Sequence, residues 1–137
     1  FKQKTAYEIR NCDWSSDVCS SDLTGETEEE MATAEFAVRK QIAFYGSTPA
    51  YRTVLEHHGW GDAQSELNAM SKRGEWDAMA DLIDADMLNE FAVVAEPDKV
   101  AGEIKSRYAH LVDRFSFYAP YGSNKELWGG VIADLQS

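Results

Sequence analysis

Apolar residues recur at steps of three and four along residues 31–45, which predicts a helix with one apolar stripe. The stripe consists of Met31, Ala34, Val38, Ile42 and Tyr45. Thr27 and Glu30 precede it in a capping-box pattern, in which each side chain accepts a hydrogen bond from a backbone amide at the helix start. Gly46 is expected to end this helix.

Five more helical stretches follow from the same kind of pattern. Thr48 and Pro49 suit the N-cap and first position of a helix that ends at Gly59. The pattern then predicts helices over 62–72, stopped by Gly74, and over 76–91, bent near residues 84–86. Pro97 suits the start of the next helix, which carries Val100, Ile104, Tyr108 and Leu111, and a closing helix is expected over 124–135.

One strand is predicted, over residues 111–118, where β-branched and aromatic residues alternate with polar ones up to Pro120. Phe115 and Phe117 share one face, and Arg114, Ser116 and Tyr118 share the other. A lone strand leaves its backbone groups without partners. The order helix, strand, helix is that of the last unit of a parallel α/β fold, so the sequence predicts a sheet whose other strands lie upstream.

Residues 1–23 show neither helical nor strand periodicity. They resemble the translation of a synthetic adapter used in short-read DNA sequencing, with matches over 2–9 and 13–23 on either side of a variable barcode. We therefore expect this segment to be non-native and disordered, and we treat residues 24–137 as the C-terminal portion of a domain. Both cysteines, Cys12 and Cys19, lie in the excluded segment.

The charge of the chain excludes several classes of partner. The 137 residues carry 13 Lys and Arg against 24 Asp and Glu, a formal net charge of −11. Residues 24–137 keep 10 basic and 20 acidic side chains and contain no cysteine. This balance argues against nucleic acid and against anionic membrane surfaces as partners. No apolar run is long enough to span a bilayer, which needs about 18 residues.

Two groups of polar residues were weighed as metal sites. His57 and His58 are adjacent, so on a helix their rings point about 100° apart and are poorly placed to share one ion. Asp81, Asp84 and Asp86 lack the glycine of a calcium-binding loop, because Asn89 stands at that position. Solvent-exposed side chains are the favoured interpretation of both groups, and no metal is expected.

Two other segments have the residue types of a binding site. The turn Phe44–Tyr51 opens a helix N-terminus, which can hold an anion, although a capped corner between helices is favoured. In a parallel barrel, Arg114 and Ser116 would point into the lumen, and Tyr118 and Tyr121 would lie at the carboxyl end of the strand, where barrel active sites are built. Plain packing and hydrogen bonding is the alternative for these four residues.

Several motifs resemble the C-terminal region of luciferase-like oxidoreductases, most closely the branch assigned to the deazaflavin coenzyme F420. They are Arg39–Arg52, Leu55-Glu56, His58–Gly61, Leu67–Ala69, Ser71–Gly74, Leu82–Asp84, Phe91–Val94, Glu96-Pro97, Val112–Arg114 and Phe117–Tyr121. The resemblance covers essentially all of residues 24–137. One departure is Ala95, where the family usually has glycine.

The resemblance implies a fold and an activity. The family is a (β/α)8 TIM barrel that passes a hydride between F420, or alternatively FMN, and a small organic substrate. Residues 111–118 would be its eighth strand, and Arg114, Ser116, Tyr118 and Tyr121 would contribute to the cofactor or substrate pocket. No catalytic residue can be assigned. We expect a cytoplasmic enzyme that can form homo-oligomers and a fragment that is inactive by itself. The alternative is a small acidic helical binding module without catalysis.

Overall fold

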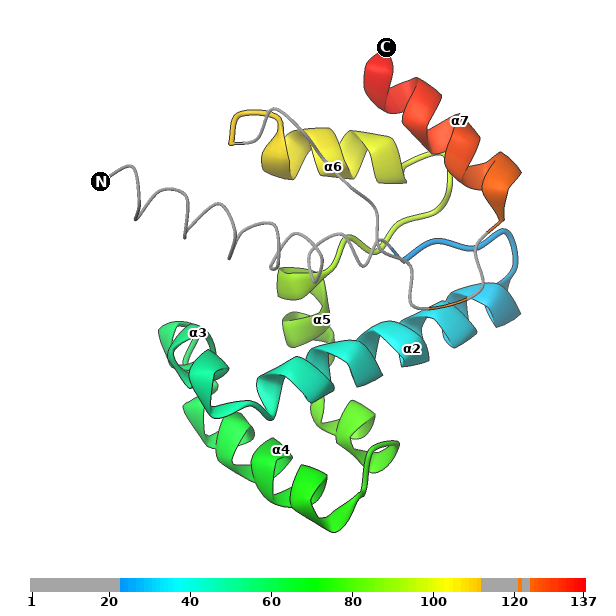
Figure 1. The fold of residues 1–137 in the computed structure, drawn as a ribbon. Coiled ribbons are helices and arrows are strands. Elements are labelled where there is room, and N and C mark those ends of the chain that lie inside the picture. The colour runs from blue at the N-terminus through cyan, green and yellow to red at the C-terminus, as the bar shows by residue number, and fades with distance from the viewer. Residues whose placement is uncertain (1–22, 112–120, 122–123) are drawn as a thin grey trace.

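The computed structural model describes residues 23–111, 121 and 124–137, and a long helix, α2 (Glu28–Gly46), runs through the middle of this part (Figure 1). The predicted capping box is confirmed at its start. The Thr27 hydroxyl accepts from the Glu30 amide at 3.1 Å. The Glu30 carboxylate reaches back one residue further than expected and accepts from the Glu26 amide at 2.8 Å. Both bonds satisfy amides that have no partner inside the helix.

The corner after α2 is a capped junction between helices. Thr48 and Pro49 take the predicted positions, but the chain first forms a short 3-10 turn, η1 (Pro49–Tyr51), and then α3 (Arg52–His57). The Ser47 carbonyl accepts from Gln64 at 3.2 Å and from Asn68 at 3.0 Å, both on α4 (Gly61–Arg73). Such short helices do not offer an anion site, so the structure favours the interpretation as a corner.

The prediction of one bent helix over 76–91 is wrong in one respect. The helix is interrupted where only a bend was expected. It forms η2 (Ala78–Leu82) and α5 (Ala85–Phe91), with Ile83 and Asp84 extended between them. Asp84 caps α5 by accepting from the Met87 amide at 2.9 Å. The Arg39 guanidinium, on α2, donates to the Ile83 carbonyl. These two bonds satisfy polar groups that a continuous helix would have paired internally.

A parallel pairing joins two distant parts of the chain. Leu23 and Val94 form an isolated parallel bridge, in which the Leu23 amide donates to the Val93 carbonyl at 2.8 Å and the Ala95 amide donates to the Leu23 carbonyl at 3.2 Å. Leu23, the last residue of the adapter-like segment, is fully buried. This bridge is the only β-pairing among the described residues. Parallel pairing is the kind expected of neighbouring strands connected by helices.

The last two described helices cover the other end of the molecule (Figure 1). Helix α6 (Val100–Tyr108) begins three residues after Pro97, but the Val100 amide already donates to the Glu96 carbonyl, so Pro97 lies in its leading turn. The closing helix, α7 (Lys125–Gln136), agrees with its predicted range. No described helix is long and apolar enough to cross a membrane.

The predicted strand over 111–118 is not confirmed. Residues 112–118, which include Arg114, Ser116 and Tyr118, lie outside the described residues. Leu111 is described, and it lies in a turn after α6, where its amide donates to the Tyr108 carbonyl and its side chain is 68% exposed. The described residues by themselves are mainly helical and do not close a barrel.

Two apolar clusters hold the described part together. The first is formed by buried side chains of α2, α4, η2 and α5 with Leu23, and the second by those of α6 and α7 with Val93. Tyr121 packs against both clusters. Val94 packs against the first cluster, and Val93 belongs to the second. The paired segment therefore lies between the two clusters.

Candidate functional site

The pairing of Leu23 with Val94 defines two ends of the molecule. Residues 24–27 leave the carboxyl end of one paired segment, and Tyr121 lies beside them, because its hydroxyl accepts from the Thr24 amide. The C-terminus of α5 leads into the amino end of the segment that contains Val94. Enzymes with parallel α/β barrels build their active sites at the carboxyl end.

A groove of about 570 Å³ opens at the carboxyl end, and we call it the carboxyl-end groove. This volume is in the range that holds small organic molecules. Its walls come from the turn after Leu23, the first turns of α2, and the start of α7. It is lined by Thr24, Gly25, Thr27, Glu29, Glu30, Thr33, Tyr121, Asn124, Leu127 and Trp128.

Thr24 is the polar residue buried most deeply in this groove. Its side chain is only 3% exposed, and its amide donates to the Tyr121 hydroxyl at 3.3 Å. The Thr24 hydroxyl oxygen is buried and has no hydrogen-bond partner among the described residues. A buried polar group without a partner costs about 1–3 kcal/mol. The Thr24 hydroxyl is therefore an unpaired polar group enclosed in the described part.

Gly25 allows the turn after Thr24 to lie directly against α2. A Cβ atom at Gly25 would lie 2.8 Å from the Glu30 Cβ and 2.9 Å from the Met31 amide nitrogen. Backbone atoms cannot yield to such a contact without moving the helix. The glycine thus permits the close approach of this turn to the first turn of α2.

Tyr121 and Asn124 also line the groove. Tyr121 is the one predicted site residue that the structure describes, and it lies in the groove, with its hydroxyl on the Thr24 amide. The Asn124 side-chain oxygen accepts from the Glu126 amide at 3.0 Å and caps α7. Leu127 and Trp128, from the first turn of α7, supply apolar surface beside these polar groups.

The charges of the groove are acidic. Glu29 and Glu30 line it, and Glu28 lies in the same first turn of α2. No Lys, Arg or His is among the described residues that line it. Carboxylates repel a phosphate group, and here no neighbouring cation offsets the repulsion. The described residues of the carboxyl-end groove therefore offer no side-chain cation to the phosphate-bearing tail of F420 or of FMN.

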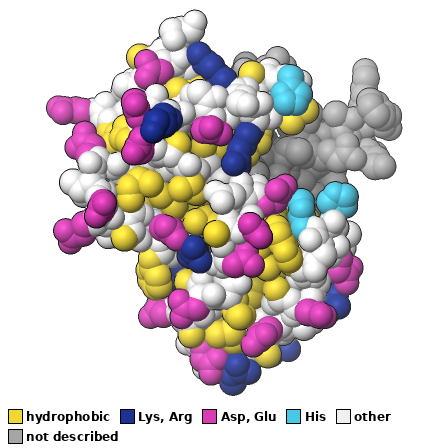
Figure 2. Space-filling view, turned by 180° about the vertical axis from the view of Figure 1, so that it is seen from behind, with side chains coloured by type: hydrophobic (Ala, Val, Ile, Leu, Met, Phe, Trp, Pro, Cys, Tyr) yellow, Lys and Arg dark blue, Asp and Glu magenta, His cyan; other side chains and the backbone are white. Residues whose placement is uncertain are grey.

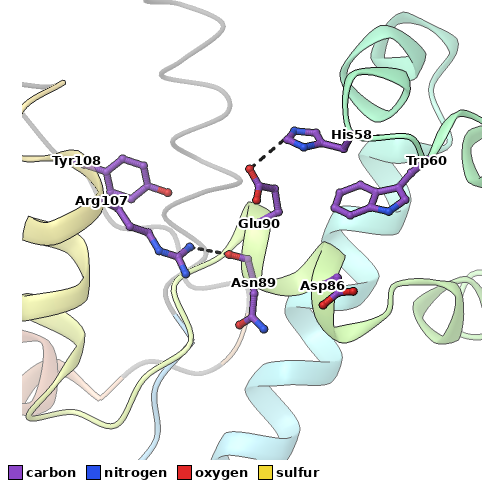
Figure 3. A pocket seen from close by; sticks show the side chains of 7 residues that line it. All are labelled: His58, Trp60, Asp86, Asn89, Glu90, Arg107 and Tyr108. Atoms are coloured by element: carbon purple, nitrogen blue, oxygen red, sulfur yellow. Dashed lines mark hydrogen bonds and ion pairs between the residues drawn. The ribbon is translucent and has the colours of Figure 1, made fainter.

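A second pocket, of about 740 Å³, lies at the amino end between α3, α5 and α6 (Figure 3). His58 and Glu90 approach each other there, with 3.9 Å between the His58 Nε2 and the carboxylate. Arg107 donates to the Asn89 carbonyl at 2.6 Å and to the Ala92 carbonyl at 3.0 Å, and so ties α6 to the end of α5. These contacts hold helices together at the end opposite to the groove.

The side chains that were considered as metal ligands either contact other side chains, cap a helix or are exposed. The His57 and His58 rings meet edge to face at 5.2 Å, and His58 stacks on Trp60. Asp84 caps a helix, while Asp81 and Asp86 are exposed. Within the described ranges, no group of three or more His, Cys, Asp or Glu side chains could hold a metal ion. Figure 2 shows acidic side chains spread over one face of the molecule, not gathered at one point.

Sequence reasoning missed Thr24 and Asn124 as groove residues. Thr24 lies outside every motif that the sequence singled out, and its burial depends on the pairing of Leu23 with Val94. Asn124 carried one usable signal, since it directly precedes the closing helix and asparagine is a favoured N-cap residue. Arg114, Ser116 and Tyr118 lie outside the described residues, so their predicted role stays a prediction.

The described residues are mainly helical, and helices connect the two segments that pair in parallel at Leu23 and Val94. Comparison with known proteins makes the assignment specific. A family model described as luciferase-like monooxygenase matches residues 24–114. The chain belongs to the luciferase-like monooxygenase family.

Its relatives include uncharacterized proteins of Mycobacterium bovis and of two strains of Mycobacterium tuberculosis. Each is 58% identical to this chain over 91 residues, which cover 66% of the chain. The chain spans 27% of the length of these relatives. No solved structure matches the chain.

Proposed function

We propose that residues 24–137 are the C-terminal portion of an oxidoreductase that transfers a hydride between F420, or alternatively FMN, and a small organic substrate. The observation that carries this proposal is the family match over residues 24–114. The parallel pairing of Leu23 with Val94 supports it, because a (β/α)8 barrel consists of neighbouring parallel strands. The chain spans 27% of the length of its relatives, which agrees with its being a portion of a larger barrel.

The carboxyl-end groove is this chain's contribution to the barrel mouth in the proposal. Thr24 follows the carboxyl end of a paired segment, and Tyr121 would follow the carboxyl end of the strand predicted over 111–118, where barrel enzymes hold their ligands. When bound in the intact enzyme, the flavin or deazaflavin supplies the hydride chemistry. Since the described residues of the groove offer no cation to the phosphate-bearing tail of either cofactor, we assign that tail to residues outside the described part, and the groove to the substrate side.

The test is to determine the genomic reading frame upstream of Thr24, in place of the adapter-like residues 1–23. We expect some two hundred residues of alternating strands and helices there, since a barrel has about 250 residues. The whole protein should bind F420 or FMN, measured by fluorescence titration, and should oxidise or reduce the cofactor in the presence of a substrate. A start codon close to Thr24, or a whole protein that binds neither cofactor, would contradict the proposal.

The 137-residue chain serves as the control. We expect it to bind neither F420 nor FMN, because the groove lacks a place for their phosphate groups and the described residues do not close a barrel. Tight binding of either cofactor by the chain alone would show that it is not an incomplete barrel. Preference for F420 over FMN is decided by titrating the whole protein with both.

A further inference from the structure

We infer that the outer face of α2 is an interface between two copies of this protein. The face is formed by Phe36, Lys40 and Phe44 on α2 together with Trp76 and Asp77, and we call it the α2 outer patch. The inference goes beyond the proposed function, because the partner is a second copy of the protein and no step of the hydride transfer enters it.

The three patch residues on α2 point away from the paired segments. The buried stripe of α2 consists of Ala34, Val38 and Ile42, which belong to the same apolar cluster as Leu23. Each patch residue on α2 stands two positions after one of these, which is about 200° around a helix. In a barrel the helices form an outer ring, so this side of α2 faces outward.

The α2 outer patch exposes large apolar side chains. Phe36 is 47% exposed, Phe44 is 51% exposed and Trp76 is 41% exposed. The ring centroids of Phe44 and Trp76 lie 5.9 Å apart, and both residues line a groove of about 420 Å³. Exposed apolar surface bordered by polar residues is typical of sites that bind another protein.

The charges of the patch favour a second copy as the partner. The Lys40 Nζ and an Asp77 carboxylate oxygen are 2.5 Å apart, and both side chains are exposed. The patch therefore has no net charge, whereas residues 24–137 carry 10 basic and 20 acidic side chains. Two such acidic chains repel each other over the rest of their surfaces. At this patch, a second copy supplies an Asp77 for each Lys40 and a Lys40 for each Asp77.

The spacing along α2 suits a two-fold axis. Phe36 and Phe44 each lie four residues from Lys40, which is about 6 Å along the helix axis. When two α2 helices pack antiparallel with the axis beside Lys40, the Phe36 of one copy lies against the Phe44 of the other, and the Lys40 and Asp77 side chains can pair between copies. The patch is thus self-complementary, as a two-fold interface between identical chains requires.

The first experiment measures the mass of the 137-residue chain in solution by sedimentation velocity, and we expect a dimer at micromolar concentration. Phe44→Gln should raise the dissociation constant about a hundredfold, because the interface loses two copies of the ring and each is worth about tenfold. Val54→Gln is the matched control, since Val54 is 44% exposed on α3, outside the patch, and it should leave the dimer unchanged. Circular dichroism checks that both variants keep their helices.

Charge reversal separates the interface from the ion pair within one chain. Lys40→Glu leaves two acidic side chains at the patch, and Asp77→Lys leaves two basic ones. At a concentration where the parent is a dimer, we expect each variant to be monomeric by itself and an equimolar mixture to form mixed dimers, detected by native mass spectrometry. Both variants lose the ion pair within the chain, so this loss cannot produce a preference for the mixed dimer.

Three results would each overturn the inference: a parent chain that stays monomeric, equal effects of Phe44→Gln and Val54→Gln, and single charge variants that dimerise as the parent does. The whole protein should behave in the same way. If the chain dimerised and the whole protein did not, another part of the protein would cover the patch, and the inference would fail.

These measurements are independent of the cofactor. If the dimer forms as expected and the whole protein binds neither F420 nor FMN, the interface stands and the proposed oxidoreductase activity fails. If the whole protein binds a cofactor as a monomer, the activity stands and the interface fails.

Discussion

At the scale of single residues, caps decide where the helices begin. Asp84 shows this most clearly, because it interrupts a stretch whose apolar positions continue on both sides, from Met79 and Leu82 to Met87 and Leu88. Its side chain accepts from the Met87 amide and replaces the bond that a continuous helix would have made. Periodicity cannot reveal such a break, since the apolar spacing is the same for one helix as for two.

We expect Asp84→Ala to lower the free energy of unfolding of the chain by about 1 kcal/mol, because the α5 cap loses its acceptor. Chemical denaturation measures the change. Asp84→Asn keeps a side-chain oxygen and should be nearly neutral. If the alanine variant were as stable as the parent, the cap would not be what holds the break.

A pH-dependent contribution is expected at Glu75. Its carboxylate accepts from the Arg73 Nε at 3.0 Å and from an Arg73 terminal nitrogen at 2.8 Å. Hydrogen bonding to Arg73 lowers the pKa of Glu75 below its ordinary value. The stabilisation is therefore present above the unfolded pKa of about 4.3 and is lost as the pH falls through the lower folded pKa.

An NMR titration of the Glu75 side chain tests this, and Arg73→Gln should return its pKa to the ordinary range. The pair is exposed, so the effect on stability is small and is best read as a difference between the parent and Glu75→Gln that disappears in acid. A difference that persisted unchanged below the folded pKa would show that the carboxylate charge is not responsible.

At the scale of elements, the sequence predicted helix ends better than helix continuity. Gly74 ends α4 in the left-handed conformation, with φ of 73°. Gly46, in contrast, is the last residue of α2 itself. Thr27 and Pro49 stand at the predicted starts. These signals are local, because a cap or a positive φ depends on a few neighbouring residues.

Two glycine substitutions should have opposite signs. Gly74→Ala should lower the free energy of unfolding by about 1 kcal/mol, because its positive φ strains a residue with a Cβ. Gly102→Ala should raise it by about 0.5–1 kcal/mol, because Gly102 lies inside α6 and a Cβ there would meet no atom within 4 Å. Thermal or chemical unfolding of both variants provides the measurement, and effects of the same sign would refute this assignment.

At the scale of the whole molecule, the pairing of Leu23 with Val94 sets the architecture and was not visible in the sequence. Val93 and Val94 belong to a short apolar run that the sequence did flag, but its partner lies in a segment that resembles adapter sequence. For the same reason, the candidate site could be predicted from the sequence only in part. Tyr121 was predicted from its place after a strand, whereas Thr24 becomes a site residue only through burial by distant parts of the chain.

Leu23→Ala should lower the free energy of unfolding by about 2–5 kcal/mol, the usual cost of truncating a fully buried leucine. Leu111→Ala makes the same chemical change at a side chain that is 68% exposed and should cost far less. Denaturation of the two variants compares them directly. Equal losses would mean that Leu23 does not occupy the core.

The same pairing has a consequence for the order of folding. The chain between Leu23 and Val94 is about seventy residues long, and closing so long a loop carries an entropic cost that local helix formation does not. Helices α2 and α4 can form and pack before the two segments meet. In pulsed hydrogen exchange, the Leu23 and Ala95 amides should therefore gain protection last, so that the groove beside Thr24 is completed only at the end of folding.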